Sequence, residues 1–76
     1  MSPSEKTRAM QQVRVLELAR EFRLTTAAVR RDLKLLRTTR VFDDTLLVLL
    51  ERTHQLSAGL AFSYLTMLLE ALRGEP

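Results

Sequence analysis

The sequence predicts an all-α domain of about four helices, because composition and hydrophobic periodicity both indicate this fold class. Leucine, alanine, arginine and glutamate dominate the 76 residues, and all four favour helices. An apolar content of 46% exceeds that of disordered chains, while two glycines and two prolines leave little room for loops. Apolar residues recur at helical spacing in four successive segments. We expect one domain over 1–76, with a motif half at 5–42 and a packing and dimerisation half at 43–76.

The first helix is predicted to run from about Glu5 or Thr7 to Arg23, with a break near residues 11–12 left open. Two apolar stripes lie along it, so it is expected to contact more than one neighbouring helix. The stripes comprise Met10, Val13 and Leu16, and Val15, Leu18, Ala19 and Phe22.

A second helix is predicted from Thr25, a suitable N-cap, to about Thr38, which completes a helix-turn-helix. Its apolar residues share one side, its cations occupy the adjacent arc, and Asp32 lies away from that arc. Basic helix faces are usually solvated surface, but the second helix of a helix-turn-helix is the element that enters the DNA major groove. The apolar side comprises Val29, Leu33 and Leu36, and the basic face comprises Arg30, Arg31, Lys34 and Arg37.

The segment LAREFRLTTAAVRRDLKLL, residues 18–36, resembles the helix-turn-helix of DeoR-type bacterial repressors, whose pattern runs close to L-A-x-x-F-x-V-S-x-x-T-V-R-R-D-L. The resemblance covers about a quarter of the chain. Arg23 departs from it, since glycine is usual there. A non-glycine residue at positive φ costs on the order of 1 kcal/mol, so either the turn is built differently here or the resemblance is partly accidental. The shared positions are Leu18, Ala19, Phe22, Leu24, Thr25, Val29, Arg30, Arg31, Asp32 and Leu33.

The expected function is that of a transcriptional regulator that binds duplex DNA. Residues 1–40 hold ten lysines and arginines against four acids, a net +6, whereas residues 41–76 carry a net −3. Three cations are expected to face base edges, three to bind phosphates, and Thr26, beside Ala27, to reach a phosphate or a thymine methyl. The base-facing cations are Arg30, Arg31 and Lys34, and the phosphate-binding ones are Arg23, Arg37 and Arg40.

Residues 38–42 are predicted to form a loop, with a reduced wing as the alternative. A third helix begins after Asp43, the predicted N-cap, where Phe42 and Leu47 have the spacing of a hydrophobic staple. The segment Leu46–Leu50 is apolar around most of its circumference and is expected to be the most buried part of the chain.

The last helix is predicted to start after Ser57 and to end near Arg73 and Gly74. Its apolar surface exceeds what a domain of this size readily covers, so a homodimer is expected, with packing inside one monomer as the alternative. The residues assigned to the dimer contact are Leu60, Tyr64, Met67 and Leu68.

A second resemblance offers a different partner. The segment 40–44, RVFDD, followed by an apolar helix and then GLAF at 59–62, resembles the middle of MerR-type proteins and of a related family of chaperone modulators. That resemblance implies a protein-binding adaptor whose C-terminal helices contact a J-domain co-chaperone.

Enzymatic chemistry is not expected. His54 is the only histidine and is interpreted as a hydrated residue at a helix end, and cysteine is absent. We therefore expect no metal site and no cofactor. The N-terminus has no apolar core of signal-peptide length, and Leu46–Leu50 is far shorter than a membrane span, so a cytoplasmic protein without membrane contact is expected.

Overall fold

The computed structural model describes residues 3–39 and 43–74, with side chains from residue 11 onwards. Four helices make up this part of the chain, and it contains no strand: α1 (Pro3–Phe22), α2 (Thr26–Thr38), α3 (Asp44–His54) and α4 (Ala58–Arg73). The prediction of an all-α domain of about four helices is therefore confirmed. Residues 40–42, where we predicted a loop or a reduced wing, lie outside the described residues, as does Phe42 of the proposed staple.

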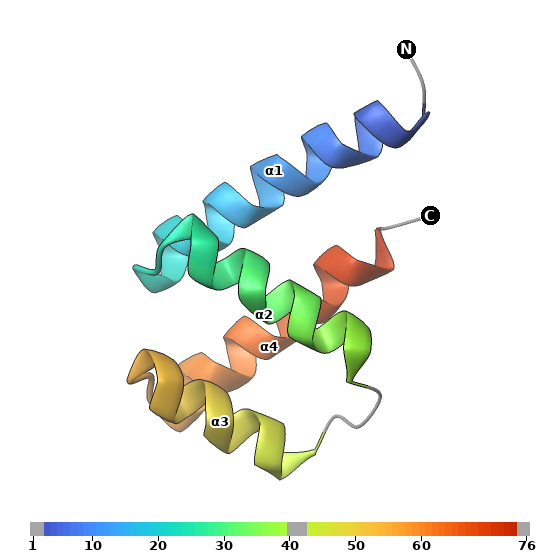
Figure 1. Ribbon diagram of the computed structural model, residues 1–76. Helices are drawn as coiled ribbons and strands as arrows, with labels where there is room; N and C mark the ends of the chain where they lie inside the picture. The colour runs from blue at the N-terminus through green and yellow to red at the C-terminus, as the bar shows by residue number, and fades with distance from the viewer. Residues whose placement is uncertain (1–2, 40–42, 75–76) are drawn as a thin grey trace.

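The helices form two hairpins, α1–α2 and α3–α4 (Figure 1). Within the described ranges, α4 is the one helix whose backbone lies against all three others, while the backbone of α3 lies against α4 alone. The N-terminal part of α1 extends beyond the other helices (Figure 1), and the molecule measures 40 × 26 × 17 Å. Since α1 runs unbroken over 20 residues, the break near residues 11–12 is absent.

Side-chain caps begin three of the helices where the sequence predicted them. The Thr25 hydroxyl accepts a hydrogen bond from the Ala28 amide at 3.1 Å. The Asp43 carboxylate accepts from two amides of the first turn of α3, and the Ser57 hydroxyl accepts from the Leu60 amide at 3.3 Å. Each cap satisfies a backbone donor that the helix itself leaves unpaired.

The turn before α2 keeps a left-handed residue, although Arg23 stands where glycine is usual. Arg23 adopts a left-handed conformation, with φ at 57°. The amide of Leu24 then donates to the Ala19 carbonyl at 2.8 Å, the bond that closes a Schellman-type helix end. Of the two alternatives, a turn of different build is therefore excluded: the chain keeps the left-handed residue at Arg23 and bears the cost of a side chain there.

One face of each helix supplies the core, which differs from the predicted core in α1 and in α3. The first stripe of α1 is exposed at Val13 and Leu16, and only the second stripe is buried. The helix still lies against both α2 and α4, so the prediction of more than one neighbouring helix is confirmed. In α3, Leu46 and Leu50 are buried but Val48 and Leu49 are 41% and 47% exposed, because α3 packs against a single helix. The buried apolar residues are Val15, Leu18, Ala19, Phe22, Val29, Leu33, Leu36, Leu46, Leu50, Ala61, Tyr64, Leu65, Leu68 and Ala71.

The predicted dimer contact on α4 is wrong at two of its four residues. Tyr64 and Leu68 are both 0% exposed within a single chain, where they pack against the other helices. Met67 is half-buried against the same core, and Leu60 alone of the four is largely exposed. Helical spacing placed these residues on related faces of α4 but did not distinguish its inner side from its outer side.

Candidate nucleic-acid interface

The outward side of α2 carries the basic face. Arg30, Arg31, Lys34 and Arg37 are all exposed. Their spacings of three and four residues place them on one continuous strip of the helix. The neighbouring side of α2 is buried through Val29, Asp32, Leu33 and Leu36. The helix therefore separates a packing side from a cationic side, as its periodicity predicted.

Three of these four cations have no partner within the chain. The side chains of Arg30, Arg31 and Lys34 make no hydrogen bond and no ion pair in the part of the protein that the structure describes. Arg37 differs, because its Nη2 donates to Oε1 of Gln11 at 2.9 Å. Like charges three and four residues apart repel one another, so an external anion would stabilise this face.

The remaining residues assigned to DNA contacts are placed less uniformly. Arg23 is exposed in the turn that precedes α2, and Thr26 is half-buried in the first turn of that helix. No acid occurs in this first turn, which leaves the positive end of the helix dipole uncompensated. Arg40 lies outside the described residues. The structure thus brings together four of the seven predicted residues and places two more at the start of α2.

A groove of about 300 Å³ runs between α1 and α2, beside the basic face. Its floor is apolar, and cations from α2 border it. Gln11, for which no role was predicted, also lines this groove, on the side of α1. Glutamine on a helix is ordinary surface composition, so periodicity gave no signal for it.

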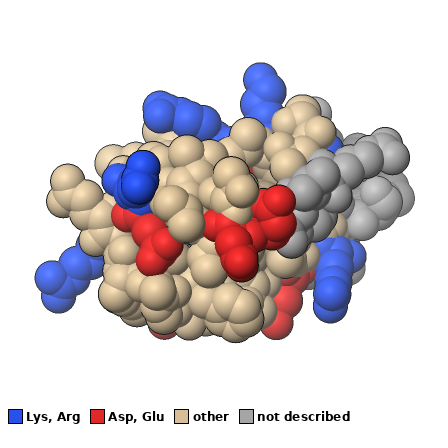
Figure 2. Space-filling view, turned by 90° about the horizontal axis from the view of Figure 1, so that it is seen from below, with Lys and Arg blue, Asp and Glu red and all other residues tan. Residues whose placement is uncertain are grey.

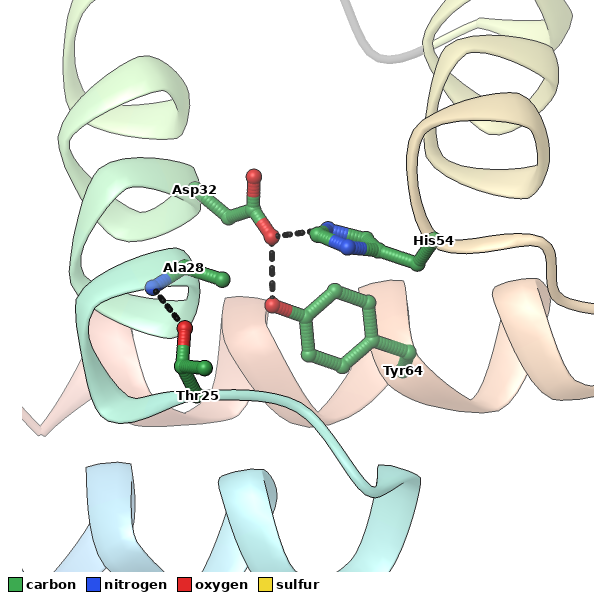
Figure 3. A network of polar contacts seen from close by, with 5 residues as sticks. All are labelled: Thr25, Ala28, Asp32, His54 and Tyr64. Atoms are coloured by element: carbon green, nitrogen blue, oxygen red, sulfur yellow. Dashed lines mark hydrogen bonds and ion pairs between the residues drawn. The ribbon is translucent and has the colours of Figure 1, made fainter.

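A buried polar network lies behind the basic face (Figure 3). Asp32 is only 6% exposed, and its Oδ2 accepts a hydrogen bond from the Tyr64 hydroxyl at 2.5 Å. His54 Nε2 lies 2.6 Å from the same oxygen, and since a carboxylate only accepts, this nitrogen carries the proton. The ring of Tyr64 also meets those of Phe22 and His54 edge to face, with centroids 5.0 and 5.5 Å apart.

The burial of Tyr64 and its hydrogen bond to Asp32 both raise the pKa of the phenol well above its usual range. His54 ends α3, so the network joins α2, α3 and α4 through one carboxylate. Because α3 has no backbone contact with α2, this network is a direct polar link between the two helices. The network holds Asp32 inward, on the side of α2 that Val29, Leu33 and Leu36 also bury, and this orientation leaves the basic face outward.

The network corrects our interpretation of two residues. His54 does lie at a helix end, but its imidazole contacts Asp32 and is not simply hydrated. Asp32 was expected only to lie away from the cations, yet it is the one buried charged residue among those described. Its position three residues after Val29 and four before Leu36 was an available signal, since an acid on an apolar face requires a partner.

The charge distribution differs on the side of α3. Seen from below, acidic side chains gather in the middle of the surface, and lysine and arginine side chains project towards its edges (Figure 2). Among the described residues, no group of three or more histidine, cysteine, aspartate or glutamate side chains is placed to hold a metal ion.

Within the described chain, no single helix is long and apolar enough to cross a membrane; α3 and α4 together reach the required length and composition, but they are bent by 109°. Comparisons with protein-family models, with curated proteins and with solved structures find no match to this chain.

Proposed function

We propose that this protein is a DNA-binding transcriptional regulator that inserts α2 into the major groove of duplex DNA. One observation carries the proposal. Arg30, Arg31 and Lys34 are exposed on the second helix of a helix-turn-helix, and no residue of the described chain neutralises them. This helix is the one that such motifs place in the groove.

The position of each cation suggests its role. Arg30, Arg31 and Lys34 would face base edges, where one bidentate arginine–guanine pair contributes roughly 1–3 kcal/mol of discrimination. Arg23, in the turn, and Arg37, towards the end of α2, would bind phosphates on either side. Phosphate binding releases counterions, so the affinity should fall steeply with salt.

A homodimer remains part of the proposal, on a revised surface. Leu60 and Phe62 on α4 are 51% and 63% exposed, and a second copy could cover them. Two copies related by a twofold axis would place their α2 helices in major grooves about 34 Å apart.

A protein-binding adaptor is the second candidate, and the exposed apolar side chains of the α3–α4 hairpin favour it. Val48 and Leu49 on α3, and Leu60 and Phe62 on α4, are all exposed. Large apolar side chains at the surface are typical of protein contacts when they are contiguous. On this alternative, the hairpin would bind a purified J-domain, and the basic face would not be needed.

The two candidates are separated by a pair of double variants with equal loss of charge. Arg30→Ala/Lys34→Ala removes two cations of the basic face, and Arg52→Ala/Arg73→Ala removes two exposed cations of the other hairpin. Binding to a duplex selected from a random library is followed by fluorescence anisotropy. We expect the first variant to bind at least about tenfold more weakly, given roughly 1–3 kcal/mol per base contact, and the second to bind nearly as well as the parent.

Circular dichroism of both variants should match the parent, since the replaced side chains are exposed and alanine favours helices. Equal losses in the two variants would indicate attraction by net charge alone and would contradict a specific role for α2. Unchanged binding in both, together with capture of a purified J-domain, would favour the adaptor.

A further inference from the structure

Helix α1 carries an apolar stripe that no other part of the described chain covers. Val13 and Leu16 are 53% and 58% exposed, although α1 packs against both α2 and α4. At 100° per residue, they lie on the side of the helix opposite Val15, Leu18 and Phe22, which are buried. The N-terminal part of α1 also extends beyond the other helices (Figure 1). Adjoining apolar side chains at a surface are typical of a contact with another protein chain.

The two sides of α1 that flank this stripe face different helices. On one side, Gln12 borders the space between α1 and α2. On the other side, Arg14 and Glu17 border the space between α1 and α4, together with Glu21 and Glu70. The side chains of Arg14 and Glu17 are exposed and make no hydrogen bond or ion pair within the described ranges. One edge of the stripe therefore offers a cation and an anion to a partner.

The order of these charges makes the stripe complementary to itself. When two copies of α1 lie antiparallel, with Val13 of each against the partner's Leu16, a twofold axis passes between them. The same register brings Glu17 of each copy within side-chain reach of the partner's Arg14, so the pair contains two ion pairs. A parallel pair would instead set Arg20, one turn beyond Leu16, against the partner's Arg20, and these like charges repel.

We propose that α1 pairs in antiparallel orientation with α1 of a second copy. Val13 and Leu16 form the apolar centre of this contact, and Glu17 binds the partner's Arg14 at its edge. The contact is distinct from the one that Leu60 and Phe62 offer on α4. The occupant is a copy of this chain because the antiparallel stripe supplies both members of each ion pair.

The symmetry of this pair also orients the helices that flank α1. The twofold axis of an antiparallel pair is perpendicular to both helices, so a neighbour on one side of α1 lies on the same side in both copies. Both α2 helices therefore lie on one side of the pair, and both α4 helices lie on the other. This consequence rests on the proposed function, in which two α2 helices must reach the same duplex.

Sedimentation of the full chain without DNA tests the contact over a series of protein concentrations. The parent should show a monomer–dimer equilibrium, and Leu16→Lys should weaken dimerisation at least about tenfold, because two apolar side chains are replaced by like charges. Leu60→Lys is the matched control, since Leu60 and Leu16 are 51% and 58% exposed. It should leave the dimer unchanged. A parent that stays monomeric at millimolar concentration, or equal weakening in both variants, would overturn the proposal.

Exchange of the edge charges tests the antiparallel register. Arg14→Glu and Glu17→Arg should each weaken the dimer about tenfold, because two ion pairs become two contacts between like charges. The double variant Arg14→Glu/Glu17→Arg should restore parent affinity, since each ion pair is then reversed. A mixture of the two single variants should form mixed dimers in preference to either homodimer. Absence of rescue in the double variant would exclude this register.

DNA binding tests the orientation of the α2 helices separately. The duplex selected for the parent is compared with one shortened to a single half-site, and the ratio of the two affinities is measured. Leu16→Lys should reduce this ratio about tenfold or more, whereas Leu60→Lys should preserve it. An equal ratio in the parent and in Leu16→Lys would overturn the arrangement on DNA. If no duplex binds, the proposed function fails, while sedimentation still decides the contact through α1.

Discussion

The two hairpins of this protein have the same turn and different outer faces. Arg23 after α1 and Gln55 after α3 both adopt the left-handed conformation, with φ at 57° and 53°. A half-buried leucine follows each of them, and its amide donates to the carbonyl five residues earlier, at 2.8 Å and 3.0 Å. A hydroxyl N-cap, Thr25 or Ser57, then begins the next helix. The same local geometry therefore builds both helix-turn-helix units.

The equivalence extends along α2 and α4 at a constant offset of 32 residues. The buried positions of one helix match those of the other: Val29 with Ala61, Asp32 with Tyr64, Leu33 with Leu65, and Leu36 with Leu68. Asp32 and Tyr64, which occupy equivalent positions, bond directly to each other.

The exposed positions do not match. Where α2 has Arg30, Arg31 and Lys34, α4 has Phe62, Ser63 and Thr66, all of them exposed. The turns and buried residues thus determine the shared framework, while the outer residues give each helix its own surface. On the proposed function, α2 would bind DNA, and the exposed side chains of α4 would remain for contact with protein.

The largest expected effect on the free energy of unfolding tests whether α2 and α4 contribute equally to the core. Leu36→Ala and Leu68→Ala should each lower the free energy of unfolding by about 2–5 kcal/mol, because both remove a buried leucine side chain and leave a cavity. A domain of this size has a total stability of only about 5–10 kcal/mol, so either variant should be partly unfolded in mild urea. Urea titration followed by circular dichroism measures both.

Phe62→Ala is the control for this pair, since Phe62 is large but exposed on the same helix as Leu68. Its free energy of unfolding should change by less than about 1 kcal/mol. A mild effect of Leu36→Ala beside a severe one of Leu68→Ala would show that the α3–α4 hairpin folds without α2 and would break the equivalence.

The elements of the fold were predictable from sequence because their signals are local. Thr25, Asp43 and Ser57 cap helices at the expected positions, and the spacing of Val29, Leu33 and Leu36 identified the buried side of α2. The basic face followed from the same spacing, since cations adjacent to a buried side must lie outward.

Contacts between distant residues were not predictable in this way. Periodicity showed that Tyr64 and Leu68 lie on apolar positions, but not that other helices of the same chain cover them. Asp32 contacts His54 and Tyr64, which lie 22 and 32 positions further along the chain, and no local pattern links the three residues. Arg-Leu-Thr at 23–25 and Gln-Leu-Ser at 55–57 share a pattern that was available in the sequence as a signal for two equivalent turns.

An intermediate effect on stability is expected at the hydrogen bond between Asp32 and Tyr64, the equivalent residues of α2 and α4. Tyr64→Phe keeps the ring but removes the hydroxyl that donates to Asp32, so the free energy of unfolding should fall by about 1.5–3 kcal/mol, the contribution of a hydrogen bond to a charged group. The stabilisation should also depend on pH, because burial and Asp32 raise the pKa of Tyr64. Folded Tyr64 keeps its proton where the unfolded chain loses it, so its contribution is complete below about pH 10 and declines above it by up to about 1.4 kcal/mol per pH unit.

Urea titrations of the parent and Tyr64→Phe near neutral pH and near pH 11 measure this change. Tyr64 is the only tyrosine of the chain, so the variant removes the whole phenol contribution and lysine titration cancels between the two proteins. The difference between them should shrink by about 1 kcal/mol at the higher pH. A constant difference would show that the hydroxyl is not held in its neutral form by the fold.

The smallest expected effect separates the shared turns from the different surfaces. Arg23→Gly and Gln55→Gly should each raise the free energy of unfolding by roughly 0.5–1 kcal/mol. Relief of a left-handed side chain, about 1–2 kcal/mol, outweighs the added freedom of glycine in the unfolded chain. The same gain in both variants would establish that the two turns are energetically alike.

Only Arg23→Gly removes a cation beside the basic face, so it alone should weaken DNA binding and lower the salt dependence by about one phosphate contact. Equal affinities in the two variants would confine DNA recognition to α2 itself, whereas a loss in Gln55→Gly would mean that the second hairpin also touches the duplex.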